Sequence, residues 1–282
     1  RRSSDLRITA TGSLVYTNVT EHVKIGDAPA DFQRLAPSFT VSLQPWQEQL
    51  LFLRLMYKST FRMPTFNDLY YYRLGNRSLR PEKANEYNMG ITWSRSFSSF
   101  LNYLSVTVDG YYNDVTDKIV AFPTTYAWKM ANYGKVHVTG MDATLAAAAS
   151  LGKNMVLVVS GGYTWQKAID LTDATSKSYK DQLPYTPKHS GNVSAVLEMP
   201  WVNVGYSIVG VSERYSMSQN IPENRIDGYM EHTASLSRNF SFRHCKLRLQ
   251  AEIINMTDTQ YDVIKYYPMP GRSWRLTGTI EF

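Results

Sequence analysis

Long apolar runs and cysteine are what this sequence most clearly lacks. Its longest apolar candidate, Leu145 to Leu151, is far shorter than the roughly 18 to 20 apolar residues of a membrane-spanning helix. Any insertion into a membrane must therefore use strands. Cys245 is the single cysteine, which excludes an internal disulfide framework and a thiolate zinc cluster.

Dense basic tracts and catalytic motifs are also lacking. The net charge of +6 would permit nucleic-acid binding, but Lys and Arg are scattered along the chain, so we expect no nucleic-acid partner. The sequence contains no HExxH, no GxSxG, no Walker-type loop and no EF-hand calcium loop. We therefore expect a protein that is not an enzyme, with no catalytic residues, no metal site and no cofactor.

Aromatic residues and strict alternation are abundant instead. Aromatics make up 13% of the chain, a balance that suits strands and membrane interfaces. From Ser273 to Phe282 one face of a strand would be apolar and the other polar, and the segment from Lys246 to Ile253 repeats the scheme. Polar residues expected on inner faces, where water or a plug must satisfy them, are Arg54, Lys58, Glu198, Arg248, Glu252, Arg275 and Glu281.

About twelve strands follow from this pattern, many of them ~10 to 14 residues long, as tilted membrane strands require. Their expected spans are 5–17, 37–44, 50–58, 85–97, 103–114, 134–149, 154–166, 188–199, 202–215, 229–240, 245–255 and 272–282. Short connections alternate with long ones at 18–36, 59–84, 115–133, 167–187, 216–228 and 256–271. The sequence therefore predicts an all-β fold, an antiparallel transmembrane β-barrel with tight periplasmic turns and large external loops.

The terminal Phe282 indicates which end of the strands faces outward. Outer-membrane barrels typically end in a strand that closes on an aromatic residue, so the C-terminus is expected in the periplasm. Every long connection then lies outside the cell, and residues 1–4 fall in a periplasmic turn. Aromatic residues near strand ends, expected to form two interfacial girdles, are Trp46, Tyr57, Trp93, Tyr112, Trp165, Trp201 and Trp274.

The expected loop at 59–84 carries a distinctive motif. Phe61 to Tyr70 reads FRMPTFNDLY, Gly75 to Lys83 reads GNRSLRPEK, and Glu86-Tyr87 follows. This region resembles the TonB-dependent outer-membrane receptors, with Arg77 where members of that family often have Pro. Further similar segments are Asn132-Tyr133-Gly134, Gly140-Met141-Asp142, 184–189, Asn255 to Asp258 with Gln260-Tyr261, and 268–272 up to Phe282.

The resemblance implies a 22-stranded barrel in the bacterial cell outer membrane, filled by an N-terminal plug domain. Such a receptor imports a scarce nutrient of the siderophore-iron, haem or cobalamin class with energy from TonB. Residues 1–282 are then expected to be the C-terminal portion of the barrel, the plug and first strands being a second chain or a removed segment. The implied partners are that portion, the TonB complex through it, outer-membrane lipid and lipopolysaccharide, and a small-molecule metal chelate or similar ligand.

Aromatic and cationic side chains in the expected external loops are the candidate ligand contacts. Aromatic faces and guanidinium groups together can hold a flat or anionic ligand. The candidates are Tyr70, Tyr71, Tyr72, Arg73, Tyr126, Trp128, Tyr185, Tyr266 and Tyr267.

Two other classes of protein fit parts of the pattern. A barrel closed from about twelve strands could act as a passive, porin-like channel. A large soluble all-β binding module would also alternate, but it has no reason to alternate the lengths of its connections.

Overall fold

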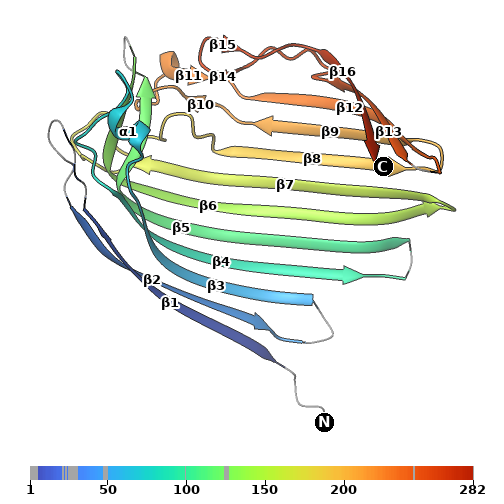
Figure 1. Ribbon diagram of the computed structural model, residues 1–282, viewed down its shortest axis with the longest axis horizontal. Helices are drawn as coiled ribbons and strands as arrows, with labels where there is room; N and C mark the ends of the chain where they lie inside the picture. The colour runs from blue at the N-terminus through green and yellow to red at the C-terminus, as the bar shows by residue number, and fades with distance from the viewer. Residues whose placement is uncertain are drawn as a thin grey trace.

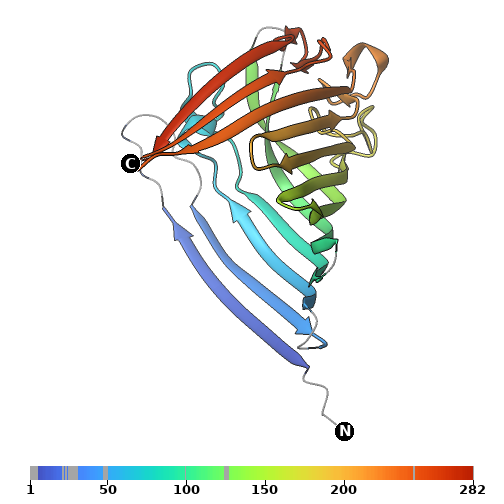
Figure 2. The same cartoon turned by 90° about the vertical axis from the view of Figure 1, so that its right-hand side faces the viewer.

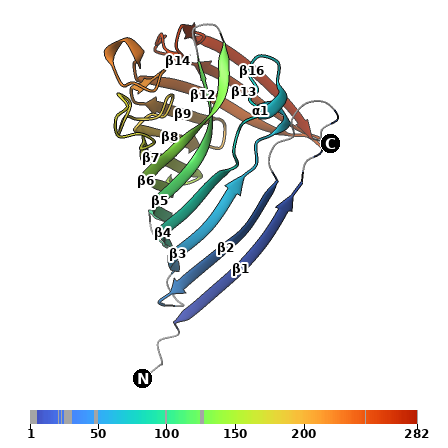
Figure 3. The same ribbon diagram turned by 90° about the vertical axis from the view of Figure 1, so that its left-hand side faces the viewer.

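A single curved antiparallel sheet makes up most of the computed structural model, which describes residues 6–20, 22, 24, 31–46, 50–98, 100–123, 127–243 and 245–281. Its twelve strands follow one another as β1-β2-β3-β4-β5-β6-β7-β8-β9-β12-β13-β16 (Figure 1). The path is an up-and-down meander. The curvature is plain when the sheet is seen from its ends (Figures 2 and 3), with β1 and β16 as the first and last strands of the order.

The bounds of the elements show how regular the meander is. The sheet strands are β1 (Arg7–Val19), β2 (Phe32–Gln44), β3 (Leu50–Arg62), β4 (Glu82–Ser96), β5 (Leu101–Pro123), β6 (Trp128–Gly152), β7 (Met155–Asp170), β8 (His189–Glu198), β9 (Asn203–Val211), β12 (Tyr229–Ser241), β13 (Lys246–Ile254) and β16 (Ser273–Glu281). The loops contain α1 (Phe66–Tyr70), β10 (Arg214–Tyr215), η1 (Pro222–Asn224), β11 (Arg225–Ile226), β14 (Asp262–Ile264) and β15 (Tyr267–Pro268).

The predicted fold class and strand number are confirmed, and one predicted loop is wrong. The sequence pattern ended one strand at 114 and began the next at 134. In the structure β5 and β6 extend beyond these limits and remain paired as far as Pro123 and Trp128. This extension is held by ladder bonds and by apolar pairs such as Val115 opposite Val136. Polar residues within it, including Asp117 with a φ of 56°, resemble a loop in sequence although the chain remains paired. The expected loop 115–133 is therefore a two-stranded projection.

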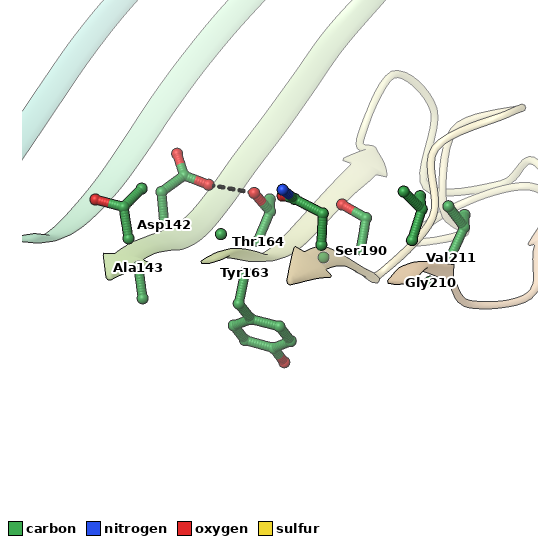
Figure 4. A pocket seen from close by; sticks show the side chains of 12 residues that line it. Asp142, Ala143, Tyr163, Thr164, Ser190, Gly210 and Val211 are labelled. Atoms are coloured by element: carbon green, nitrogen blue, oxygen red, sulfur yellow. Dashed lines mark hydrogen bonds between the residues drawn. The ribbon is translucent and has the colours of Figure 1, made fainter. Parts of the chain in front are cut away.

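The two faces of the sheet differ in polarity, as the alternation predicts. One register row is apolar and runs through Leu53, Ile91, Val108 and Ala143. The adjacent row runs through Arg54, Gly90, Asp109, Asp142 and Thr164. In Figure 4, Asp142 and Thr164 project toward the side to which the sheet curves, and Tyr163 projects from the opposite side. The concave face is thus polar, and the convex face is apolar.

The folded loops gather at one end of the sheet, at the left of Figure 1, and short turns occupy the other end. Two small cores lie among these loops. Leu183, from the loop after β7, packs with Val115 and Val136, while Leu69 and Leu79 belong to a second cluster. Among the described residues, no helix is long and apolar enough to cross a membrane.

Candidate ligand site in the outer loops

The polar concave wall is a network of paired side chains. Arg54 donates through Nη2 to Asp109 Oδ1 at 2.8 Å and through Nη1 to Thr92 at 2.7 Å. Farther along the sheet, Arg275 donates to Glu252 at 2.6 Å. Three residues predicted to face inward, Arg54, Glu252 and Arg275, therefore lie in ion pairs on this wall.

The loop between β3 and β4, residues 63–81, is called the motif loop here, and it is braced by its own polar groups. Thr65 and Asp68 form a capping box, in which Asp68 N–H donates to Thr65 Oγ1 and Thr65 N–H donates to Asp68 Oδ2. The same carboxylate oxygen accepts from Arg62 Nη2 at 2.9 Å. The FRMPTFND part of the motif thus fixes the start of α1 to the end of β3.

The second half of the motif loop is fixed to the projection formed by β5 and β6. Asn76 donates to the carbonyl of Met130 at 3.1 Å, and Arg80 pairs with Asp117. Gly75 lies so close to α1 that a Cβ there would meet the backbone of Leu69 at 2.7 Å. Any larger residue at this position must displace backbone, which explains the glycine in the motif.

Four predicted ligand contacts lie in the motif loop, and of these Tyr70 packs against the cluster that contains Leu69 and Leu79. Tyr72 is 79% exposed, and the Arg73 guanidinium lies over its ring at 5.1 Å. Tyr71 is also exposed. Tyr70 is half-buried, with Arg77 over its ring at 5.2 Å. The structure therefore brings Tyr72 and Arg73 into contact as a free aromatic and cationic pair.

Two more predicted residues, Trp128 and Tyr185, contact one another across loops. Their ring centroids are 5.9 Å apart, although 57 positions separate them in the sequence (185 − 128). Tyr185 has a φ of 58°, and its N–H donates to the carbonyl of Tyr215. Tyr185 thus joins the loops that follow β7 and β9. Tyr126, also predicted as a ligand contact, lies outside the described residues.

A buried arginine that the sequence did not single out organises the loops after β9 and β13. Arg214 is 4% exposed and donates through Nη2 to the carbonyls of Asp262 and Val263 at 2.6 and 3.0 Å. Its guanidinium lies over the ring of Tyr229. Its Nη1 is buried and has no hydrogen-bond partner among the described residues. A buried donor without an acceptor costs about 1–3 kcal/mol, and more when it is charged.

Aromatic and acidic groups continue this cluster. The rings of Tyr229 and Tyr261 stack at a centroid distance of 3.9 Å, and the Tyr261 hydroxyl donates to Glu231. Tyr229 and Glu231 occupy alternate positions at the start of β12, so they share one face of that strand. We call Arg214, Tyr229, Glu231 and Tyr261 the Arg214 cluster.

A cavity of about 300 Å³ adjoins the Arg214 cluster between the loops after β9 and β13. Tyr261 is a member of the Arg214 cluster and also lines this cavity. The predicted residue Tyr266 lines the cavity, while Tyr267 is exposed beside it in β15. Cations and anions both contribute to the lining, which consists of Arg225, Ile226, Asp227, Gly228, Gln260, Tyr261, Asp262, Lys265, Tyr266 and Pro268. The volume is at the lower end of the range for small-molecule sites.

Burial changes the acidity of two phenols in these loops. Burial raises the pKa of Tyr185, although a hydrogen bond from the Lys265 backbone and the nearby Arg214 charge oppose the change. Burial also raises the pKa of Tyr261, and the Glu231 carboxylate, which accepts the hydrogen bond of the phenol, raises it further. Both phenols are therefore neutral hydrogen-bond donors at physiological pH.

Sequence reasoning missed the Arg214 cluster because its members are distributed over three segments. Arg214 fell inside a strand predicted at 202–215, where it would count as one more wall residue. One local feature of the sequence could have indicated that the strand ends before Arg214. β9 ends at Val211, and the following Ser212-Glu213-Arg214 interrupts the apolar alternation.

The fold and these loops together define a class of protein. A curved meander with an apolar convex face, a polar concave face, short turns at one end and folded, aromatic loops at the other is the wall and outer cap of a transmembrane β-barrel. The chain belongs to the TonB-dependent receptor family, because the family model described as "TonB dependent receptor-like, beta-barrel" matches residues 3–256.

Individual relatives agree with this assignment. The vitamin B12 transporter BtuB of Photobacterium profundum is 25% identical over 230 residues, which cover 79% of this chain and 34% of that protein. The ferric-catecholate import receptor Fiu from E. coli K12 has the same fold with a TM-score of 0.65 at 18% identity, covering 98% of this chain and 42% of that one. For the siderophore receptor PiuA from Acinetobacter baumannii the TM-score is 0.66 at 18% identity, and the coverage is 98% and 40%. This chain therefore spans about a third of the curated relative's length.

Proposed function

We propose that this chain is part of an outer-membrane active-transport receptor that takes up a scarce nutrient with energy from the TonB complex. Membership of the TonB-dependent receptor family is the observation that carries the proposal. By their names, the relatives reported above are a vitamin B12 transporter, a ferric-catecholate import receptor and a siderophore receptor, which supports a nutrient of the siderophore-iron or cobalamin class. The family resemblance of the sequence adds haem as a third candidate. We infer no catalytic role.

The receptor's barrel is larger than this chain. In lipid every backbone group needs a hydrogen-bond partner, and β1 and β16 each pair with one strand of the described sheet. We infer that residues 1–282 are the C-terminal portion of the barrel, and that both edges pair with strands of polypeptide outside this sequence. A structure of the complete barrel in lipid nanodiscs tests this inference. Direct pairing of β1 with β16 would contradict it.

The folded loops face the cell exterior in this proposal. Asp173 lies in the loop after β7, and Lys153 lies in the tight turn between β6 and β7 at the opposite end. An epitope tag inserted at Asp173 should bind antibody on intact cells, and a tag at Lys153 should bind only after the outer membrane is opened. The reverse result would overturn the sidedness.

The outer loops contact the nutrient through aromatic and cationic groups. We propose Tyr70, Tyr71, Tyr72, Arg73, Tyr126, Trp128, Tyr185, Tyr266 and Tyr267 as contacts, with the Arg214 cluster as an addition. An anionic group that enters the cavity beside Lys265 and Tyr266 can accept from the lysine ammonium group and the Tyr266 phenol. When the loops shift, it can also accept from Arg214 Nη1. The cavity suits a citrate-sized anion or one arm of a larger chelate.

Equilibrium binding tests this function. The complete receptor, purified in detergent, is titrated with ferric citrate, a ferric catecholate, haem and cyanocobalamin. We expect one class to bind at micromolar concentration or below, and uptake of that compound by cells should stop when the TonB complex is deleted. Binding of none of the four, or uptake that persists without TonB, would contradict the proposal.

A further inference from the structure

Three tyrosine–histidine pairs recur on the convex, apolar face of the sheet. In each pair the tyrosine lies on one strand of a hairpin and the histidine on the next strand. The pairs are Tyr112 with His137, Tyr163 with His189, and Tyr206 with His232. In the second and third pairs the phenol oxygen lies 2.7 Å from the histidine Nδ1.

The pairs follow one oblique line across the strands. The register row of Tyr112 reaches Lys167 on β7, four residues beyond Tyr163 (167 − 163). The row of Tyr163 reaches Gly210 on β9, four residues beyond Tyr206 (210 − 206). Equal steps of this kind mark a plane that crosses tilted strands, as the surface of a membrane does.

Residues on either side of this line differ in polarity. Toward the short turns, the convex positions of β8 after His189 are Gly191, Val193, Ala195 and Leu197. Toward the folded loops, β7 presents Trp165, the register partner of His189, and then the exposed Lys167. The line is therefore the boundary between hydrocarbon and headgroups on the outer side.

A hydrogen-bond donor is left over in the second and third pairs. Whether the phenol donates to Nδ1 or accepts from it, one polar hydrogen of the pair has no partner within it, either His Nε2–H or Tyr O–H. No further side-chain partner is recorded for His189 or His232 among the described residues. In the first pair His137 Nε2 lies 3.2 Å from Asp114 Oδ1, so a carboxylate of the protein already lies beside this imidazole. A free donor facing hydrocarbon costs several kcal/mol, which only a lipid headgroup or water can offset.

An apolar groove of about 440 Å³ begins at His189 and runs down the convex face. Its floor is lowered by Gly191 and Gly210, which lack side chains on this face, and Val193 and Met230 also line it. The lining of the groove is apolar, as the binding of an acyl chain requires, and the groove reaches the imidazole of His189 at its upper end. Lys167 lies on the same face, two residues beyond Trp165, the register partner of His189.

We propose that this surface binds an outer-leaflet lipid whose phosphate lies at His189 and Lys167 and whose acyl chain lies in the Gly191–Gly210 groove. The proposal rests on the outer-membrane location given above. A phosphate accepts from the free donor of the Tyr163–His189 pair and from the ammonium group of Lys167, and two cationic or donor groups above an apolar groove match a phosphorylated glycolipid.

Lipid retention by the complete receptor tests the proposal. The delipidated receptor in detergent is incubated with diphosphorylated lipid A or with its dephosphorylated form, and bound lipid is counted by native mass spectrometry. We expect wild type to prefer the phosphorylated form by about tenfold, corresponding to one or two charge-assisted hydrogen bonds. Equal retention of the two forms would overturn the phosphate site.

Variants separate the two parts of the site. His189→Phe keeps the ring and removes the donor, so the preference for phosphate should fall about fivefold, whereas the control His137→Phe should leave it unchanged. Gly210→Leu fills the groove, where a Cβ meets only Met230 at 3.7 Å, and should reduce retention of both lipids. If His189→Phe does not insert, Lys167→Gln provides the phosphate test. An unchanged preference in these variants contradicts the proposal. Nutrient binding measured on the same samples should be normal, so failure of the lipid site is distinct from failure of the proposed transport function.

Discussion

The motif loop and the Arg214 cluster lie at the same end of the sheet, yet their polar groups are used differently. In the motif loop Asp68 accepts two hydrogen bonds at 2.9 Å, and Asn76 and Arg80 are bonded to the projection of β5 and β6. In the Arg214 cluster a nearly fully buried guanidinium keeps one nitrogen without a partner among the described residues. A satisfied network favours one fixed structure, while an unsatisfied donor leaves capacity for a ligand.

The difference teaches that a recognisable motif and a binding site need not coincide. Three residues of the family-like segments hold the loop together: Arg62 at the end of β3 pairs with Asp68 in α1, and Gly75 allows close packing against the backbone of α1. The exposed Tyr71, Tyr72 and Arg73 extend from this fixed base. The motif therefore forms the rigid base from which these exposed side chains extend.

Replacing Gly75 with Ala should have the largest effect on the motif loop. The new Cβ would lie 2.7 Å from backbone atoms of Leu69 and Tyr71, which cannot rotate away. We expect a loss of about 3 kcal/mol or more in local stability, seen as faster amide hydrogen exchange over residues 63–81. Gly12→Ala, with no atom within 4 Å, is the matched control. Unchanged exchange at 63–81 would mean that the loop is not held as described.

Asp68→Ala should have the next largest effect. It leaves the Thr65 N–H and the Arg62 guanidinium without their acceptor, which should cost about 2–3 kcal/mol. The same exchange measurement applies, with limited proteolysis as a second probe. Asp173→Ala, in another loop, should leave the protection of 63–81 as it is. If Asp68→Ala also behaves like wild type, the capping box contributes nothing to the stability of the motif loop.

Replacing Tyr70, Tyr71 and Tyr72 together with Ala should weaken nutrient binding by about 1–3 kcal/mol if they act as aromatic anchors. Barrel insertion, measured by the heat-modifiable migration of the protein in gels, should be normal because Tyr71 and Tyr72 are exposed and only Tyr70 packs against the loop cluster. Unchanged affinity would remove the motif loop from the ligand site. Failure to insert would assign these tyrosines to folding.

The smallest expected effect is the pH dependence contributed by Tyr185. Its pKa is raised in the folded protein, mainly by burial, so the phenol favours the folded state below its ordinary pKa near 10. This stabilisation is lost as pH rises through the higher folded pKa. The difference in Tm between wild type and Tyr185→Phe should therefore shrink as the pH rises above the ordinary phenol pKa of about 10. A constant difference would contradict the burial of this hydroxyl.

Much of the wall could be predicted from sequence, because period-two alternation directly reports a sheet with two unlike faces. The inward positions of Glu252 and Arg275 followed from that pattern, whereas the ion pair between them was found only in the structure. The long projection of β5 and β6 did not, since its Asp117 and Asn132 resemble loop residues while their hydrogen bonds hold the neighbouring loop. The Arg214 cluster could not be predicted either, because only the folded loops bring Arg214, Tyr229 and Tyr261 together.

Binding of the nutrient to an arginine variant tests the central claim most directly, namely that the unsatisfied cluster and not the braced motif supplies the main anion contact. Arg214→Met keeps an apolar side chain of similar length, and Arg272→Met removes an exposed arginine from the loop after β13 that does not line the cavity. Titration of both variants with the probe that binds wild type should show at least a tenfold loss for Arg214→Met, about 1.4 kcal/mol or more, and little change for Arg272→Met. Wild-type affinity in a correctly inserted Arg214→Met receptor would contradict the account.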